Sequence, residues 1–186
     1  MMAHPSHNAL KSHCLPATEH SVMTSWPLWP NEIKAINNLI EQFPGQVIAC
    51  VMDSHDYDSA LKNIIPGIVK KVYENKWHFV IRPDSGDSVR QLIHALDTLN
   101  SINTIRKTKN KLNYTVIYTV FDSFSVIQGD GIDYEVVDQI LNAMEDKKYS
   151  AENVAFGMGG GLFQKVNRDK QSEDTEYANI RPNIQN

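Results

Sequence analysis

Apolar residues recur along the chain in two patterns, one typical of helices and one of buried strands. Isoleucines at helical spacing predict a helix over 31–43, which ends at Pro44-Gly45. The continuous apolar run QVIACVM, residues 46–52, predicts a buried strand. A second helical pattern covers 56–73. We expect Pro66-Gly67 to interrupt it, because proline cannot continue the helical hydrogen-bond ladder.

The same unit of strand, loop and helix then recurs. Short apolar runs predict three further strands, at 78–81, 125–128 and 153–156. Asp87 or Ser88 caps the helix after the first of these, and Asp133 caps the helix after the second. The stretch 100–123 is the hardest to interpret, and its second part, NYTVIYTVF, favours an extra strand. Strands that alternate with helices predict parallel βα units and hence an α/β fold.

Composition indicates one ordinary domain. The chain has 186 residues, of which 41% are hydrophobic, and a net charge of −4, which is enough apolar material for one core. The 18 Lys and Arg residues form no basic stripe, so we expect no nucleic-acid partner. No apolar run is long enough to cross a bilayer, so we expect no membrane partner. Cys14 and Cys50 have no metal-binding spacing, and reduced thiols of this kind indicate a cytoplasmic protein.

An aspartate follows each of the first three predicted strands, namely Asp53, Asp84 and Asp130. In parallel sheets and βα barrels, the loops after the strands lie on one face, and that face holds the active site. Two interpretations follow. Each carboxylate caps the next helix, or the three converge on a metal, a sugar hydroxyl or a cationic group. Arg82, close to Asp84, favours the second interpretation.

The fourth predicted strand runs into the glycine-rich sequence GMGGG, residues 157–161. Glycines let a backbone approach an anion and present successive N–H groups to it. A helix after the loop would add the positive end of its dipole. These features favour a phosphate site, with a flexible turn as the alternative. Arg168, further along, is either a bidentate phosphate contact or a solvated surface charge.

His20 lies in the sequence Glu19-His20-Ser21. A single histidine is more often structural than catalytic. A neighbouring carboxylate can fix the tautomer of an imidazole and raise its basicity, and Glu19 is the candidate for that role. Spacing alone does not decide between the structural and the catalytic interpretation.

Five strings stand in order along the chain: LPATEHSVMTSW, VMDSHDYDSA, VIRPDSGD, VIQGDGI and NVAFGMGGGLFQKVNRD. In this order and at about this spacing they resemble the nicotinamide phosphoribosyltransferase family. The resemblance covers 14–169. It implies an α/β fold that is part of a βα-barrel-like, type II phosphoribosyltransferase domain. We expect an irregular N-terminal tail over 1–13 and a polar, disordered C-terminal tail over 170–186.

The resemblance implies a role for each matching residue. His20 matches the histidine that is phosphorylated when ATP drives the reaction and that otherwise lies near the pyrophosphate. Arg82 matches an arginine on the pyrophosphate and phosphoribosyl group. Asp84 matches the aspartate on the ribose hydroxyls, and Asp53 a carboxylate beside magnesium and the ribose. Gly129 and Asp130 match contacts to the ribose phosphate side of the nucleotide. Gly159, Gly160 and Arg168 match the family's phosphate-binding loop.

The family's reaction joins nicotinamide to phosphoribosyl pyrophosphate and gives nicotinamide mononucleotide and pyrophosphate, in NAD salvage. The resemblance implies Mg²⁺ as cofactor, ATP as an optional coupling substrate, and a homodimer in the complete enzyme. The family's enzymes are far longer than this chain. Their nicotinamide pocket uses an aromatic stack and an amide-binding aspartate from a region that would precede Met1. We therefore expect a fragment, a truncated product or a chain that needs a partner.

Three alternatives stay open beside this interpretation. The first is a nicotinate phosphoribosyltransferase, although the RPDSG and GMGGGLFQK strings favour nicotinamide. The second is a truncated, non-catalytic remnant that binds nucleotide or phosphate without turnover. The third is a βα-barrel lyase or isomerase acting on a phosphorylated metabolite. It predicts a catalytic lysine on a strand, and the predicted strands contain none.

Overall fold

A parallel sheet forms the centre of the molecule. The computed structural model describes residues 16–26, 32–43, 47–102, 107–117 and 123–157. Four parallel strands lie in the order β1-β2-β5-β6. Their bounds are Val47–Val51, His78–Arg82, Ser123–Gln128 and Val154–Phe156. The predicted α/β fold is thus confirmed.

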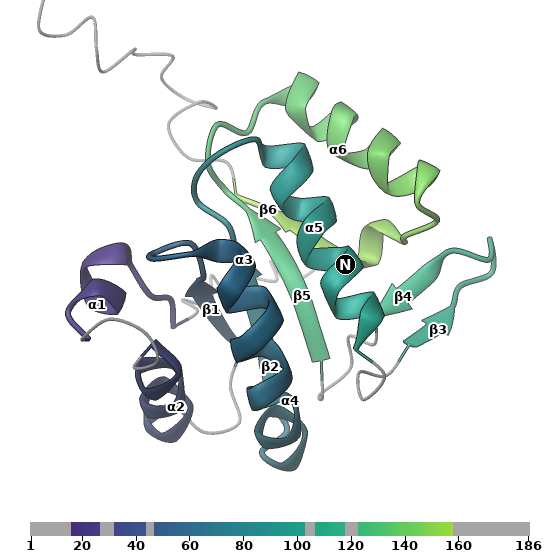
Figure 1. Cartoon of the computed structure of the whole chain (residues 1–186). Helices are drawn as coiled ribbons and strands as arrows, with labels where there is room; N and C mark the ends of the chain where they lie inside the picture. The colour runs from purple at the N-terminus through teal and green to yellow at the C-terminus, as the bar shows by residue number, and fades with distance from the viewer. Residues whose placement is uncertain (1–15, 27–31, 44–46, 103–106, 118–122, 158–186) are drawn as a thin grey trace, which may run out of the picture.

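A short segment extends the sheet beyond β1. The backbone N–H of Thr18 donates to the carbonyl of Ala49, and the N–H of Ala49 donates to the carbonyl of Pro16, each at 3.0 Å. The segment at Pro16 to Thr18 and the four strands therefore lie side by side in the same order as they occur in the sequence. A βα barrel has this order, so the arrangement fits an arc of one (Figure 1).

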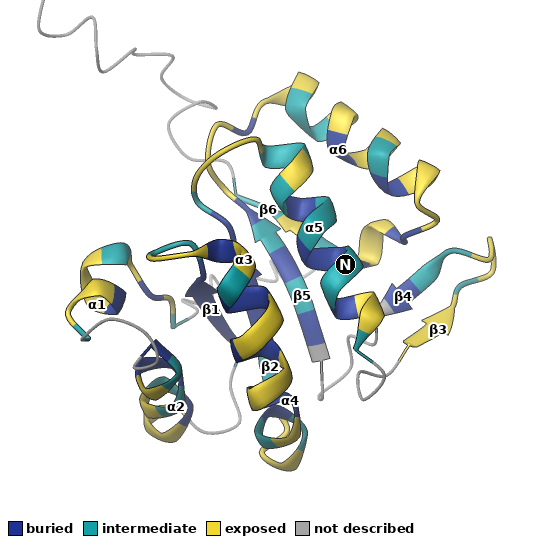
Figure 2. Cartoon of the chain, viewed as in Figure 1, coloured by how far each residue is buried: buried dark blue, intermediate teal, exposed yellow. Residues whose placement is uncertain are grey.

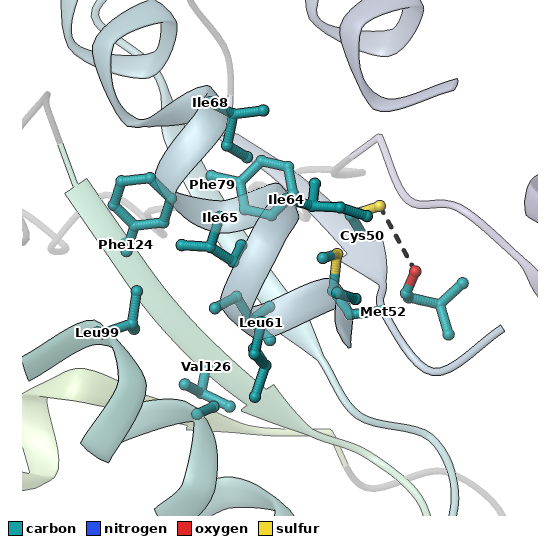
Figure 3. Packing of buried hydrophobic residues seen from close by; sticks show 14 of the residues in the cluster. Cys50, Met52, Leu61, Ile64, Ile65, Ile68, Phe79, Leu99, Phe124 and Val126 are labelled. Atoms are coloured by element: carbon teal, nitrogen blue, oxygen red, sulfur yellow. Dashed lines mark hydrogen bonds between the residues drawn. The ribbon is translucent and has the colours of Figure 1, made fainter. Parts of the chain in front are cut away.

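Helices follow the strands and bury their apolar faces against the sheet (Figures 1 and 2). Their bounds are α1 His20–Thr24, α2 Glu32–Gln42, α3 Tyr57–Ser59, α4 Ile65–Glu74, α5 Ser88–Ser101 and α6 Tyr134–Asp146. In the core beneath them, Phe79 and Phe124 face each other in register on neighbouring strands, with ring centroids 6.0 Å apart (Figure 3). This buried face fixes the register of the strands and so the positions of the loops that follow them.

The predicted interruption of the helix over 56–73 exists, but it lies one turn before Pro66. Residues Ala60–Ile64 form a π-helical turn, and the N–H of Ile65 donates to the carbonyl of Ala60. Pro66 then stands in the first turn of α4, where its missing N–H leaves no hydrogen bond unmade. Gly67 gives α2 room, because a Cβ there would lie 3.3 Å from Cδ1 of Ile33.

The stretch 100–123 holds a hairpin outside the main sheet. Strand β4, Thr115–Ile117, confirms part of the predicted extra strand, but it pairs antiparallel with β3, Lys107–Lys109. The N–H of Ser150 donates to the carbonyl of Thr115 at 2.9 Å, which ties the hairpin to the segment after α6. The predicted tails, 1–13 and 170–186, lie outside the described residues.

Two smaller findings complete the fold. Among the described residues, no helix combines the length and the apolar character needed to cross a bilayer. Cys50 is a buried free thiol, and its burial raises its pKa to about 12. It accepts a hydrogen bond from the hydroxyl of Thr18 at 3.5 Å. Cys14 lies outside the described residues.

Candidate functional site

Four candidate side chains occupy the same place in successive units. His20 stands two residues after Thr18, the last residue of the segment beside β1, and Asp53 stands two residues after β1. Asp84 and Asp130 stand two residues after β2 and β5. Because the strands are parallel, these positions lie at one end of the sheet.

The first three of these side chains meet. Nε2 of His20 lies 3.0 Å from Oδ1 of Asp53, and Nδ1 of His20 lies 3.5 Å from Oδ2 of Asp84. The imidazole therefore stands between two carboxylates that come from neighbouring strands. A carboxylate only accepts, so the contact with Asp53 requires a proton on Nε2. In the neutral imidazole, the lone pair is then on Nδ1.

Asp53 is the most enclosed member of the group, with a side chain that is 4% exposed. Its Oδ2 accepts from the backbone N–H of Asp84 at 2.8 Å and from the hydroxyl of Ser85 at 2.6 Å. Burial alone would raise the pKa of Asp53. The hydrogen bonds from Ser85, Asp84 and His20 outweigh burial and lower that pKa from its usual value. Asp53 is therefore a fixed, ionised carboxylate that orients His20 and holds the loop after β2.

Arg82 is paired with Glu19, which corrects the expectation that Glu19 fixes the tautomer of His20. Nη2 and Nη1 of Arg82 donate to the two carboxylate oxygens of Glu19 at 3.2 and 3.5 Å. Nε of Arg82 lies 3.9 Å from Oδ1 of Asp84. Neighbours in sequence need not meet at a helix start: Glu19 precedes α1 and turns toward β2, while His20 turns toward Asp53.

The strand-end aspartates do not cap the helices. The caps stand three residues further along. Asp56, Asp87 and Asp133 accept from the N–H of Ser59, Arg90 and Val136, at the starts of α3, α5 and α6. The spacing Asp-x-x-Asp therefore occurs in all three loops, as DSHD, DSGD and DGID. In each loop the second aspartate caps the helix that follows, so the first aspartate is not needed as a cap. This repeat is visible in the sequence and distinguishes the capping aspartates from the strand-end aspartates.

Asp130 lies apart from the other three. It is exposed, and among the described residues its side chain makes no hydrogen bond or ion pair with His20, Asp53 or Asp84. Its carbonyl accepts from the hydroxyl of Ser88 at 3.5 Å, so the start of α5 supports this loop. Asp130 therefore lies at the same end of the sheet as the site, because it follows β5.

The glycine-rich loop begins against Gly129. The N–H of Gly157 donates to the carbonyl of Gln128 at 2.9 Å. A Cβ on Gly157 would lie 3.4 Å from Cα of Gly129, so the two loops approach backbone to backbone. Gly159, Gly160 and Arg168 lie outside the described residues, and their phosphate role stays a prediction.

A buried carboxyl, Glu32, lies behind the site and was not expected from the sequence. It is a buried side chain at the start of α2, and its Oε1 has no hydrogen-bond partner in the structure. Burial first, and then the charges of Asp53 and Asp56, raise its pKa to about 7. A glutamate in the first turn is normally a helix-start signal, so nothing in the sequence marks it as buried.

Magnesium was assigned to Asp53, and the geometry bears on that assignment. Both oxygens of Asp53 already accept hydrogen bonds, whereas the side chain of Asp84 is 32% exposed. Within the described residues, no group of three or more His, Cys, Asp or Glu side chains is arranged to hold a metal ion. Magnesium commonly uses one or two carboxylates together with substrate phosphates. Asp84 suits that partial role better than Asp53.

Comparisons with known proteins identify relatives of this chain. A nicotinamide phosphoribosyltransferase of Xanthomonas campestris pv. campestris (strain 8004) is 38% identical over 94% of the chain. Proteins of the same name from Mycoplasma genitalium and Mycoplasma pneumoniae are 30% and 29% identical, over 85% and 82% of the chain. In each case the match covers 36% of the relative, so the chain spans about a third of the length of these curated relatives.

The family match is broader than the five strings. The model of the nicotinate phosphoribosyltransferase (NAPRTase) family matches residues 6–186, which extends beyond the 14–169 region on both sides. The repeated loop positions, the His20 cluster and this match over almost the whole length agree: the chain belongs to the nicotinate phosphoribosyltransferase family.

Proposed function

We propose that this chain forms the phosphoribosyl pyrophosphate side of a nicotinamide phosphoribosyltransferase site. The complete reaction would join nicotinamide to phosphoribosyl pyrophosphate and release nicotinamide mononucleotide and pyrophosphate. The observation that carries the proposal is the convergence of His20, Asp53, Asp84 and Arg82 at the carboxyl end of the sheet. The names of the relatives favour nicotinamide over nicotinate as the base.

The charges suit the two ends of the substrate. Cleavage of the bond between ribose and pyrophosphate builds positive charge on the sugar and negative charge on the leaving group. The guanidinium of Arg82 would bind the pyrophosphate, and the more exposed carboxylate of Asp84 would accept from the ribose hydroxyls and stabilise the positive sugar. Their separation of 3.9 Å, Nε to Oδ1, keeps both groups within reach of one substrate.

His20 would take part in the coupling to ATP. With the Nε2 proton held by Asp53, the lone pair of Nδ1 would attack the γ-phosphorus of ATP, forming the N–P bond as the bond to the bridging oxygen breaks and ADP leaves. Asp53 would stabilise the positive charge that then develops on the ring. Mg²⁺, when bound with the substrate phosphates, would neutralise part of their charge. Of the two carboxylates that contact His20, Asp84 is the more exposed and would contact Mg²⁺.

A second candidate function is binding of nucleotide or phosphate without turnover. The observation that favours it is that the contacts of Arg82 and Asp84 lie within the described residues, in a chain that spans about a third of the length of its relatives. Such a chain would retain the Arg82 and Asp84 contacts and lose catalysis. Formation of nicotinamide mononucleotide separates the two candidates.

The proposal is tested by titrating the purified chain with phosphoribosyl pyrophosphate in a calorimeter. We expect Arg82→Ala to weaken binding by at least about tenfold, since a charge-assisted contact contributes on the order of 1.5–3 kcal/mol. The matched control is Arg90→Ala, which removes an exposed arginine on α5. Equal affinities for the wild type and Arg82→Ala would contradict the proposal.

A further inference from the structure

Arg82 is already occupied by an anion of the chain itself. The two oxygens of Glu19 accept from Nη2 and Nη1 of Arg82, which is the side-by-side geometry in which a guanidinium binds a phosphate. Glu19 thus stands where an oxyanion of a ligand would stand. This observation is independent of the family resemblance, although its consequence rests on the function proposed above.

The two partners differ in how firmly the protein holds them. The side chain of Glu19 is 65% exposed, whereas that of Arg82 is 15% exposed. An exposed ion pair contributes little to stability and is screened by salt. Glu19 precedes α1, but its side chain makes no capping hydrogen bond to that helix. Glu19 can therefore leave Arg82 without disturbing α1.

Arg82, in contrast, stays in position when Glu19 leaves. Its side chain is mostly enclosed, and its Nε points within 3.9 Å of Asp84. That Nε is buried and has no hydrogen-bond partner in the structure. The arginine is thus held by its surroundings, and its Nη1 and Nη2 are the donors that an anionic ligand can take over from Glu19.

We propose that Glu19 is a placeholder for the diphosphate and sets the affinity of the site for it. In the free protein, Glu19 neutralises Arg82. An incoming diphosphate displaces the Glu19 carboxylate into solvent and takes over Nη1 and Nη2. Glu19 therefore lowers the affinity of the site for anions and makes release of pyrophosphate easier. Because His20 is the next residue, the displacement occurs beside the imidazole.

The test uses the full chain, inorganic pyrophosphate without magnesium, and calorimetry at low ionic strength. The variants are Glu19→Gln, Arg82→Ala and, as the matched control, Glu74→Gln. Glu74 is 63% exposed and pairs with Lys70 on the surface of α4, so this control removes the same charge from a glutamate that is as exposed as Glu19 and also stands in an ion pair. We expect Glu19→Gln to bind pyrophosphate about three- to tenfold more tightly than the wild type. Glu74→Gln should match the wild type.

Each outcome decides the question. Tighter binding by Glu19→Gln, at an unchanged melting temperature, supports the placeholder. Equal or weaker binding by Glu19→Gln, with binding lost in Arg82→Ala, overturns the placeholder but leaves the function of Arg82 standing. If neither the wild type nor Glu19→Gln binds pyrophosphate, the placeholder and the proposed function both fail.

Discussion

His20 and Asp53 lie 33 residues apart in the chain, and Nε2 and Oδ1 of their side chains are 3.0 Å apart in the fold. The contact joins the start of α1 to the loop after β1. It forms because the segment of Pro16 to Thr18 lies parallel beside β1, so that this segment and β1 end at the same edge of the sheet. The imidazole of His20 is thereby held in place by the sheet itself.

The hydrogen bonds of Asp53 should contribute to stability. We expect Asp53→Asn to lower the free energy of unfolding by roughly 1–3 kcal/mol near neutral pH, because the amide places a donor against donors. The pKa of Asp53 in the fold lies below its ordinary value of 3.8. The stabilisation is therefore present above that value and is lost as pH falls through the folded pKa.

Urea unfolding of the wild type and Asp53→Asn, near neutral pH and at about pH 3, measures both effects. Asp130→Asn is the matched control, since Asp130 is an exposed strand-end aspartate. Its stability should stay within about 0.5 kcal/mol of the wild type. A difference between the wild type and Asp53→Asn that does not shrink at low pH would refute the role given to the ionised carboxylate.

Alanine substitutions at Asp84 and Asp87, three residues apart, should affect different properties: ligand binding for Asp84 and stability for Asp87. Asp87 caps α5, and its loss should cost about 1 kcal/mol of stability. Asp84 faces His20 and Arg82, and its loss should weaken binding of phosphoribosyl pyrophosphate by about 2–5 kcal/mol. Urea unfolding and calorimetry on both variants check this. A binding defect in Asp87→Ala as large as in Asp84→Ala would remove the distinction.

Much of this arrangement was predictable from sequence, since it depends on local patterns. The apolar runs located β1, β2, β5 and β6, and their alternation with helices implied that Asp53 and Asp84 share one edge. Residue type alone predicted Asp133 as the cap of α6 and left Asp87 and Ser88 as candidates for the cap of α5, which is Asp87. These features depend on neighbours within one turn or one strand.

The remaining features depend on tertiary contacts. The pairing of Glu19 with Arg82 spans 63 residues, and no spacing rule distinguishes it from a pairing of Glu19 with His20. The burial of Glu32 arises from the packing of the start of α2, where a glutamate is ordinary. The hairpin of β3 and β4 forms from a polar segment, in which the apolar pattern is too short to indicate a partner.

Glu32 should make the protein less stable as pH rises. Its pKa is about 7 in the fold, against 4.5 ordinarily. Between these values the folded state retains a proton that the unfolded state releases, so the free energy of unfolding falls with increasing pH. We expect the wild type to lose on the order of 1–3 kcal/mol relative to Glu32→Gln between about pH 4.5 and pH 8. Chemical unfolding of both proteins at several pH values measures this. Parallel profiles would show that Glu32 ionises without cost.

The last prediction is that these 186 residues alone form no nicotinamide mononucleotide at a useful rate. Within the described residues, the sheet ends at β6, whose Ala155 is exposed, and a closed βα barrel needs eight strands. An unpaired strand edge favours association with other chains. The resemblance also assigns the base-stacking aromatic and the amide-binding carboxylate to a region outside the chain. Without them, the nicotinamide nitrogen is not held near the sugar carbon, and the advantage of proximity is lost.

The measurement is a product assay with nicotinamide, phosphoribosyl pyrophosphate, Mg²⁺ and ATP. The Xanthomonas relative, of whose length the chain covers 36%, is assayed in parallel. We expect calorimetry to detect substrate binding by the chain while the assay detects no turnover above background. Arg82 and Asp84 need only the described sheet to be in place, whereas holding the base needs residues that the sheet does not supply. Binding and catalysis should therefore separate in this chain. Turnover comparable to that of the relative would show that these 186 residues already contain a base pocket.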